Sequence, residues 1–224
     1  MEKAPWKLIL PKVVLALSMA IMIILSLLHG SSAQTTIMDE WSTVKTPQPP
    51  ELKQVVVDPK TTALLMLDFN KQTCNAEVRP RCIVSIPHVK KLLAEARAQG
   101  SVVIYSLSSG AVPADIAREL APVQGDPIVT SGPDKFLGTD LVKILSEKKI
   151  ETVIVTGTAA HGAVLYTASG AALRGMHVIL PVDGISAESL YPEQYTVWHL
   201  LNAPRISNQT TITKIDLITF KSTK

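Results

Sequence analysis

TALLMLDF, Thr62–Phe69, is the stretch that decides the fold, because a continuous apolar run there ends at a charged residue, Asp68. An apolar run without polar alternation is typical of a strand buried on both faces, as in parallel sheets. Three similar runs follow, SVVIYSL (101–107), TVIVTG (152–157) and HVILPVD (177–183), with helix-like segments between them. This alternation predicts an α/β fold of three layers, α/β/α, in which a mostly parallel, Rossmann-like sheet carries helices on both faces.

The segments between the strands have the apolar spacing of helices. HVKKLLAEARAQG (88–100) is opened by Pro87 and closed by Gly100. The other predicted helices are PADIAREL (113–120), TDLVKILSEKK (139–149, capped by Thr139), GAVLYTASGAALRG (162–175) and SLYPEQYTVWHLLNA (189–203).

The N-terminus has the pattern of a secretory signal peptide. Three lysines precede the largely apolar run Val13–Leu28, and Ser31 and Ala33 supply small residues for cleavage. We therefore expect residues 1–33 to be removed and the protein to be periplasmic or secreted, without stable membrane association afterwards. The alternative is an uncleaved anchor, since the run is only slightly shorter than the roughly 18 to 20 residues that span a bilayer.

The rest of the chain divides into a proline-bearing linker and arm, residues 34–60, and one domain, residues 61–224. The formal net charge is +3, and loss of residues 1–33 leaves 19 basic and 18 acidic residues. So balanced a charge does not favour nucleic acid as a partner, and we expect a small-molecule substrate.

Two cysteines, Cys74 and Cys82, lie close together in a chain with an export signal. Such a pair predicts a local disulfide. The alternative is that Cys74, six residues after Asp68, is a reactive thiol.

In parallel sheets the ligand crevice lies at the carboxyl ends of the strands. This rule selects Asp68, Ser106–Gly110, Thr156–Ala163 and Asp183, with Lys135 reaching the same edge from a loop. A carboxylate between apolar walls and cations can serve as a general acid or base, although Asp68 could equally cap a turn.

The segment Gly157–Gly162 carries almost no side chains where a strand passes into a helix. Backbone N–H groups at such a point can bind an anion, and His161 adds one polar group. The alternative is close packing of the helix on the sheet, which small residues also permit.

Three motifs in this order resemble the isochorismatase-like hydrolase superfamily, which includes nicotinamidases and other cysteine hydrolases. They are LLMLDF (64–69), GPDKFLGTDL (132–141) and VIVTGTAAHGAVLYTASGAALRG (153–175). The resemblance covers about residues 61–202.

The resemblance implies that Asp68 and Lys135 are the catalytic aspartate and lysine of this superfamily. The position of its nucleophilic cysteine is occupied by Ala163. A thioester route is therefore not available there. A metal site does not carry over either, because YSLSSGAVPAD (105–115) has no histidine and the five histidines are far apart. We expect no cofactor.

True isochorismatases also lack that cysteine, and their helix start is similar to Ala160, His161 and Ala163. The resemblance then implies non-covalent acid/base cleavage of a small carbonyl or enol-ether compound, with Asp68 as general acid or base and Lys135 as its electrostatic partner. The substrate-binding residues would be Thr158, Ala159, His161, Gly162 and Ala163, and the family predicts a homo-oligomer. The loop YSLSSG lacks the basic groups that a dicarboxylate substrate would need. The alternative function is a catalytically inactive module for ligand binding or assembly.

Overall fold

The computed structural model describes residues 35–222, which fall into two units divided between Pro47 and Gln48. In the first unit a short 3-10 turn, Trp41–Thr43, follows a turn in which the Asp39 carboxylate accepts hydrogen bonds from the N–H and hydroxyl of Thr36. The predicted signal peptide lies outside the described residues. Within residues 35–222, no helix is long and apolar enough to cross a membrane.

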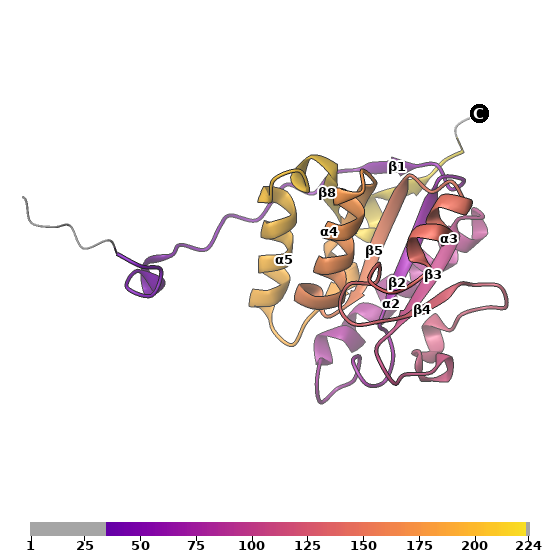
Figure 1. Cartoon of the computed structure of the whole chain (residues 1–224), viewed down its shortest axis with the longest axis horizontal. Coiled ribbons are helices and arrows are strands. Elements are labelled where there is room, and N and C mark those ends of the chain that lie inside the picture. The colour runs from indigo at the N-terminus through magenta and orange to yellow at the C-terminus, as the bar shows by residue number, and fades with distance from the viewer. Residues whose placement is uncertain (1–34, 223–224) are drawn as a thin grey trace, which may run out of the picture. The chain divides into compact units, whose positions relative to one another are not determined.

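The second unit is built on a parallel sheet, which confirms the predicted α/β fold (Figure 1). The strands run in the order β4-β3-β2-β5-β6-β8, and β7 pairs with β5 beyond the end of β6. Their bounds are β2 Thr62–Leu67, β3 Val102–Leu107, β4 Ile128–Thr130, β5 Thr152–Thr158, β6 His177–Pro181, β7 Ile185–Ser186 and β8 Thr210–Thr213.

Strand β2 lies at the centre of this sheet and is buried along its whole length. Ala63, Leu65 and Leu67 belong to the core on one face, and Leu64 and Met66 belong to the core on the other. A strand with both faces covered cannot alternate apolar with polar residues, and this explains the continuous run in the sequence.

Helices cover both faces of the sheet. The core that contains Leu65 includes residues from α3 (Leu141–Glu147), α4 (Leu165–Leu173) and α5 (Leu190–Asn202). The opposite core includes residues from α2 (Pro80–Ala98) and from a small parallel sheet of β1 (Val55–Val57) and β9 (Ile218–Phe220). The segment from residue 48 to residue 60, within the predicted arm, is part of the second unit and contributes β1.

Two predicted helices differ from those observed. Helix α2 begins at Pro80 rather than after Pro87, which lies inside it. Pro80 occupies the first helical position, where a missing N–H costs nothing. Pro87 is on the exposed side of the helix, where the carbonyl group four residues earlier, which loses its helical partner, can bind water. The segment 113–120 forms two 3-10 turns, Pro113–Asp115 and Arg118–Leu120, instead of one short helix.

Two further helices start at other residues than predicted. Asp140 is the residue before α3, although the hydroxyl oxygen of Thr139 still accepts the N–H of Leu141 at 3.2 Å. The segment predicted as one helix from residue 162 begins as a π-helical turn, Ala160–Val164, and continues as α4.

Candidate active site

Asp68 follows directly on β2 at the carboxyl edge of the sheet. Its φ of 53° is one that aspartate tolerates better than most residues, and the turn directs its chain away from the strand. The residue is only 5% exposed. The Ser106 hydroxyl, from the neighbouring strand β3, donates a hydrogen bond to Asp68 Oδ1 at 2.7 Å. The polar groups at the ends of β2 and β3 therefore meet, as the sheet rule predicts.

Lys135 reaches Asp68 from the loop between β4 and α3. Its Nζ lies 2.7 Å from Asp68 Oδ2 and donates to the carbonyl oxygen of Ser131 at 3.2 Å. The lysine side chain is 1% exposed and the aspartate side chain 7%. The prediction that Lys135 reaches this edge is confirmed, and the two charges form a buried ion pair.

Strand β5 brings the predicted binding segment beside Asp68, because Leu67 pairs with Gly157. The hydroxyl of Thr158 donates to the Ser186 carbonyl oxygen at 3.0 Å, and a cis peptide bond joins Thr158 to Ala159. Ala163 lies on the π-helical turn and is 4% exposed.

The expected anion-binding edge at this helix start is partly occupied by the chain itself. The N–H groups of Gly162 and Val164 both donate to the Ala159 carbonyl oxygen, at 2.9 and 3.3 Å. These two N–H groups are used within the turn and are not available to an anion. This supports the alternative, in which the small residues allow close packing of the helix on the sheet. Asp183 is also engaged elsewhere, because its Oδ1 accepts the N–H of Ile215 at 2.9 Å.

His161 is exposed and faces a carboxylate that the sequence analysis did not select. Its Nε2 lies 3.8 Å from Glu188 Oε1, and the other oxygen of Glu188 lies 3.9 Å from Arg79 Nε. Arg79 comes from the loop after β2, and Glu188 precedes α5. Neither residue follows a strand directly, so the rule of strand ends could not find them.

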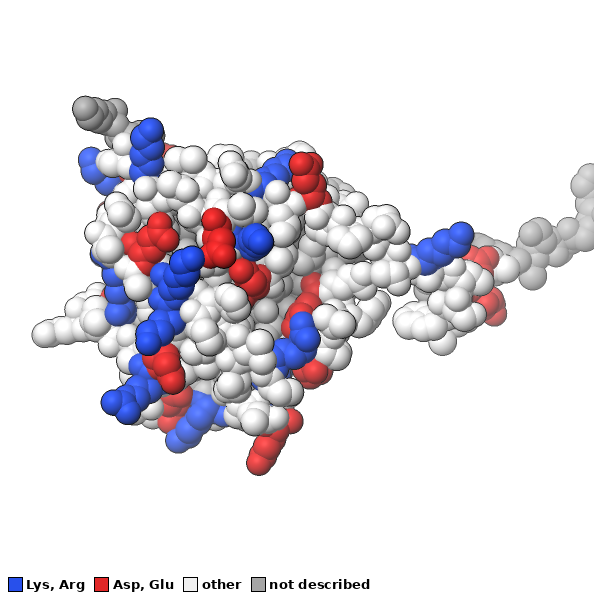
Figure 2. Space-filling model, turned by 180° about the vertical axis from the view of Figure 1, so that it is seen from behind, with Lys and Arg blue, Asp and Glu red and all other residues white. Residues whose placement is uncertain are grey.

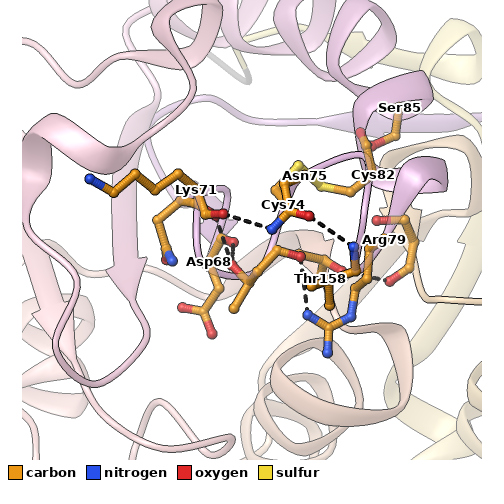
Figure 3. Close-up of a disulfide and its surroundings, with 12 residues drawn as sticks. Asp68, Lys71, Cys74, Asn75, Arg79, Cys82, Ser85 and Thr158 are labelled. Carbon is orange, nitrogen blue, oxygen red and sulfur yellow. Dashed lines mark hydrogen bonds between the residues drawn. A yellow bond between two sulfur atoms is a disulfide. The ribbon is translucent and has the colours of Figure 1, made fainter.

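The loop from Asp68 to Arg79 is held by a disulfide between Cys74 and Cys82 (Figure 3). This confirms the predicted pairing and excludes the alternative of a free reactive Cys74. Thr73, next to the disulfide, donates its hydroxyl to the carbonyl oxygen of Asp68. The disulfide therefore fixes the segment that presents the candidate catalytic carboxylate.

A second set of contacts ties this loop to the segment after β3. Asp115 is paired with Lys71 at 2.8 Å, and accepts hydrogen bonds from Gln72 Nε2 at 2.6 Å and from the Val112 N–H at 3.1 Å. The Lys71 ammonium group, followed by these two donors, lowers the pKa of Asp115 to about 2. The carboxylate is thus ionised at neutral pH and connects the two loops beside Asp68.

Loss of the disulfide is expected to destabilise the fold. The variant Cys74→Ser/Cys82→Ser lowers the free energy of unfolding by about 2 to 3 kcal/mol, because the bond closes a loop with a sequence separation of 8 and restricts the unfolded chain. Urea denaturation of this variant and of the reduced wild type measures the effect. The two losses should agree, and no change in either sample would contradict the prediction.

The described residues hold no group of three or more His, Cys, Asp or Glu side chains that could bind a metal ion. What the described residues do place at the sheet edge is a buried carboxylate and lysine beside a wall of small residues. An all-parallel α/β/α unit with such a pair at the carboxyl ends of its strands defines the class of Rossmann-like α/β proteins whose ligand crevice lies at that edge.

Within that class the chain belongs to the isochorismatase-like hydrolase family, because the model of the Isochorismatase domain matches residues 62–211. This range contains both residues of the buried pair and the whole segment from Thr158 to Ala163.

Two curated relatives match part of the chain. N-carbamoylsarcosine amidase of an Arthrobacter species is 30% identical over 128 residues, which are 45% of this chain and 48% of that enzyme. An uncharacterized isochorismatase family protein of Bacillus subtilis (strain 168) is 33% identical over 76 residues, 34% of this chain and 42% of that protein. The chain thus spans slightly less than half the length of these relatives.

Solved structures share the fold. An isochorismatase-like hydrolase from Alkaliphilus metalliredigens has a TM-score of 0.63 at 23% identity. The superposed part is 70% of this chain and 95% of the chain of that hydrolase. N-carbamoylsarcosine amidase from Thermoplasma acidophilum has a TM-score of 0.61 at 21% identity, with 70% of this chain and 97% of its own covered. At these identities the likeness shows the architecture alone.

Proposed function

We propose that this protein is an exported hydrolase that cleaves a small carbonyl or enol-ether compound by acid/base chemistry, without a covalent intermediate. The observation that carries the proposal is the buried pair of Asp68 and Lys135, 2.7 Å apart at the carboxyl edge of the sheet. A second support is Ala163, which has no nucleophilic atom at the position where the family resemblance puts a cysteine.

In the proposed mechanism Asp68, ionised in its pair with Lys135, first takes up a proton from solvent. As a general acid it transfers this proton to the enol-ether carbon, and water then adds to the oxocarbenium carbon and returns one proton to Asp68. The hemiketal so formed breaks its ether bond as its hydroxyl proton moves to the leaving oxygen, which gives a carbonyl compound and an alcohol. The ammonium group of Lys135 remains protonated and stabilises the carboxylate that Asp68 becomes. The Ser106 hydroxyl holds the other oxygen of that carboxylate in place.

The small residues after β5 would form the substrate wall. Strand β5 runs beside β2 through the pairing of Leu67 with Gly157, and we propose that Thr158, Ala159, Gly162 and Ala163, which follow this pair, contact the substrate together with His161. Their small side chains would let a ligand approach the backbone. No cofactor takes part in the proposed chemistry.

Export and assembly belong to the same proposal. Export rests on the charged, apolar and small-residue pattern of residues 1–33. A homo-oligomer is supported by the exposed aromatic side chains of Tyr191, Tyr195 and Trp198 on α5, which are 69%, 39% and 46% exposed. On the face that Figure 2 shows, acidic and basic side chains are interspersed, which does not favour nucleic acid as a partner.

The test is hydrolysis by purified residues 34–224 of a panel containing isochorismate, nicotinamide and simple amides. The variant Asp68→Asn, which keeps the side-chain size and tolerates the same φ, is expected to lose about 10²- to 10⁴-fold in kcat/KM. Circular dichroism of the variant verifies that it is folded. Equal rates for wild type and Asp68→Asn on every substrate that is cleaved would overturn the acid/base role.

One observation favours a second candidate, a catalytically inactive module that binds a ligand or assembles. Asp68 and Lys135 satisfy each other and are nearly closed to solvent, as a purely structural ion pair would be. The same assay separates the two functions. If no substrate of the panel is cleaved by the wild type while a ligand raises its melting temperature, the module is the better account.

A further inference from the structure

Arg79 lies at the end of the loop that follows Asp68, and neither the buried pair nor the proposed mechanism uses it. Its Nη1 donates to the Thr73 carbonyl oxygen at 3.0 Å, and Thr73 in turn donates its hydroxyl to the carbonyl oxygen of Asp68. The guanidinium group is thus fixed to the backbone that presents Asp68. Figure 3 shows Asp68 and Arg79 on the same loop, next to the disulfide.

The guanidinium group has bonding capacity that the protein does not satisfy. Arg79 Nε is buried and has no hydrogen-bond partner, although the side chain as a whole is 21% exposed. A buried donor in a native protein nearly always has an acceptor, and here a bound ligand can supply it. The Nε and Nη2 edge of arginine matches the two oxygens of a carboxylate.

Glu188 stands where such a carboxylate would bind. One of its oxygens is 3.9 Å from Arg79 Nε and the other is 3.8 Å from His161 Nε2, so it faces both side chains without a hydrogen bond to either. Its side chain is 46% exposed and is free to turn toward solvent. A small carboxylate that is not tied to a backbone can approach both groups more closely than Glu188 does.

We infer that Arg79 binds the anionic group of the substrate at this site. In the free protein the Glu188 carboxylate occupies the position of that group, and a carboxylate-bearing ligand displaces it. This inference rests on the proposed function and extends it, because it specifies that the substrate carries a carboxylate group. The fork of Arg79 takes the carboxylate and His161 contacts it from the helix side. The reacting end of the ligand then extends toward Asp68. Arg79 supplies the basic group that the loop after β3 lacks.

The disulfide gives this receptor its rigidity. Arg79 lies between Cys74 and Cys82, so the loop that carries the guanidinium group is closed on both sides by one covalent bond. A receptor fixed before binding loses less conformational freedom when the ligand arrives.

The test measures binding and does not require turnover. Dissociation constants are determined by calorimetry for three carboxylate and amide pairs of the same shape: propionate and propionamide, benzoate and benzamide, nicotinate and nicotinamide. For wild type, at least one carboxylate is expected to bind about 10-fold more tightly than its amide, because a charge-assisted pair of hydrogen bonds replaces a weak contact. No preference in any pair overturns the inference.

Two variants identify the receptor. Arg79→Met is expected to abolish the preference, while Glu188→Gln, at an exposed position that leaves the fold intact, tightens the binding of carboxylates by about 3-fold and leaves that of amides unchanged. A merely structural role of Arg79 predicts no gain from Glu188→Gln, so the absence of that gain would also overturn the inference.

Turnover and binding by the wild type together separate this inference from the proposed function. If the wild type shows the carboxylate preference and cleaves no substrate of the panel, the proposed catalysis fails and the receptor stands. If the protein cleaves its substrates and Arg79→Met raises the KM of anionic and neutral substrates equally, the receptor fails and the catalysis stands.

Discussion

Lys135→Met is expected to lower the free energy of unfolding by about 3 to 5 kcal/mol, because it leaves the Asp68 carboxylate buried without its cation. The two side chains are 1% and 7% exposed, so water cannot replace the lost partner. Methionine has nearly the length of the lysine stem and avoids a cavity. Urea denaturation at neutral pH measures the loss.

A double-mutant cycle separates the ion pair from other effects. Asp68→Asn combined with Lys135→Met is expected to cost less than the sum of the single changes, because the double variant contains neither buried charge. Lys143→Met is the matched control, since Lys143 is 69% exposed and only 4.0 Å from Glu147. We expect a change within about 0.5 kcal/mol there. Additive losses in the cycle would show that the pair is not coupled.

Gly157→Ala is expected to prevent Asp68 from being placed correctly and to cost on the order of 3 kcal/mol or more in stability. Gly157 has a φ of +134°, and a Cβ there would collide with the carbonyl oxygen of Leu67 and lie 2.7 Å from its Cβ. Leu67 belongs to the central strand and directly precedes Asp68, so neither side of the contact can move without disturbing the site.

Gly100→Ala is the control for this second prediction. Gly100 has a φ of +77°, and a Cβ added there meets nothing within 4 Å. Its replacement tests the backbone conformation alone, at a cost of about 1 to 2 kcal/mol. Thermal and urea denaturation of both variants measure the difference, and a loss for Gly157→Ala that is no greater than that for Gly100→Ala would contradict the proposed collision.

The central strands could be predicted from the sequence because each of them is apolar over most of its length. Burial on both faces leaves few polar positions and no charged one, so β2, β3 and β5 are recognisable from their composition. The three-residue strands β1, β4 and β9 could not be found in this way, since so short a segment carries no period. The start of α2 could not be predicted, because both Pro80 and Pro87 are compatible with the first turn of a helix and only the surrounding structure decides which of them opens it.

The residues of the candidate site also differ in whether the sequence can predict them. Asp68 and Lys135 could be selected because one ends a buried strand and both lie in motifs with a fixed order along the chain. The sequence places Ser106 at the same edge of the sheet but does not single it out, because its hydrogen bond to Asp68 depends on the pairing of β2 with β3. Arg79 and Glu188 lie more than one hundred positions apart in the sequence, and nothing local marks either of them as part of a site.

The sequence by itself determined the α/β class, the family resemblance and the absence of a nucleophile at Ala163, because each of these depends on residue types and their order. Only the tertiary structure decided that Lys135 faces Asp68 and that Glu188 stands between Arg79 and His161. These contacts join segments that the sheet brings together from distant parts of the chain, and the strand order that does so results from burying both faces of β2 at once.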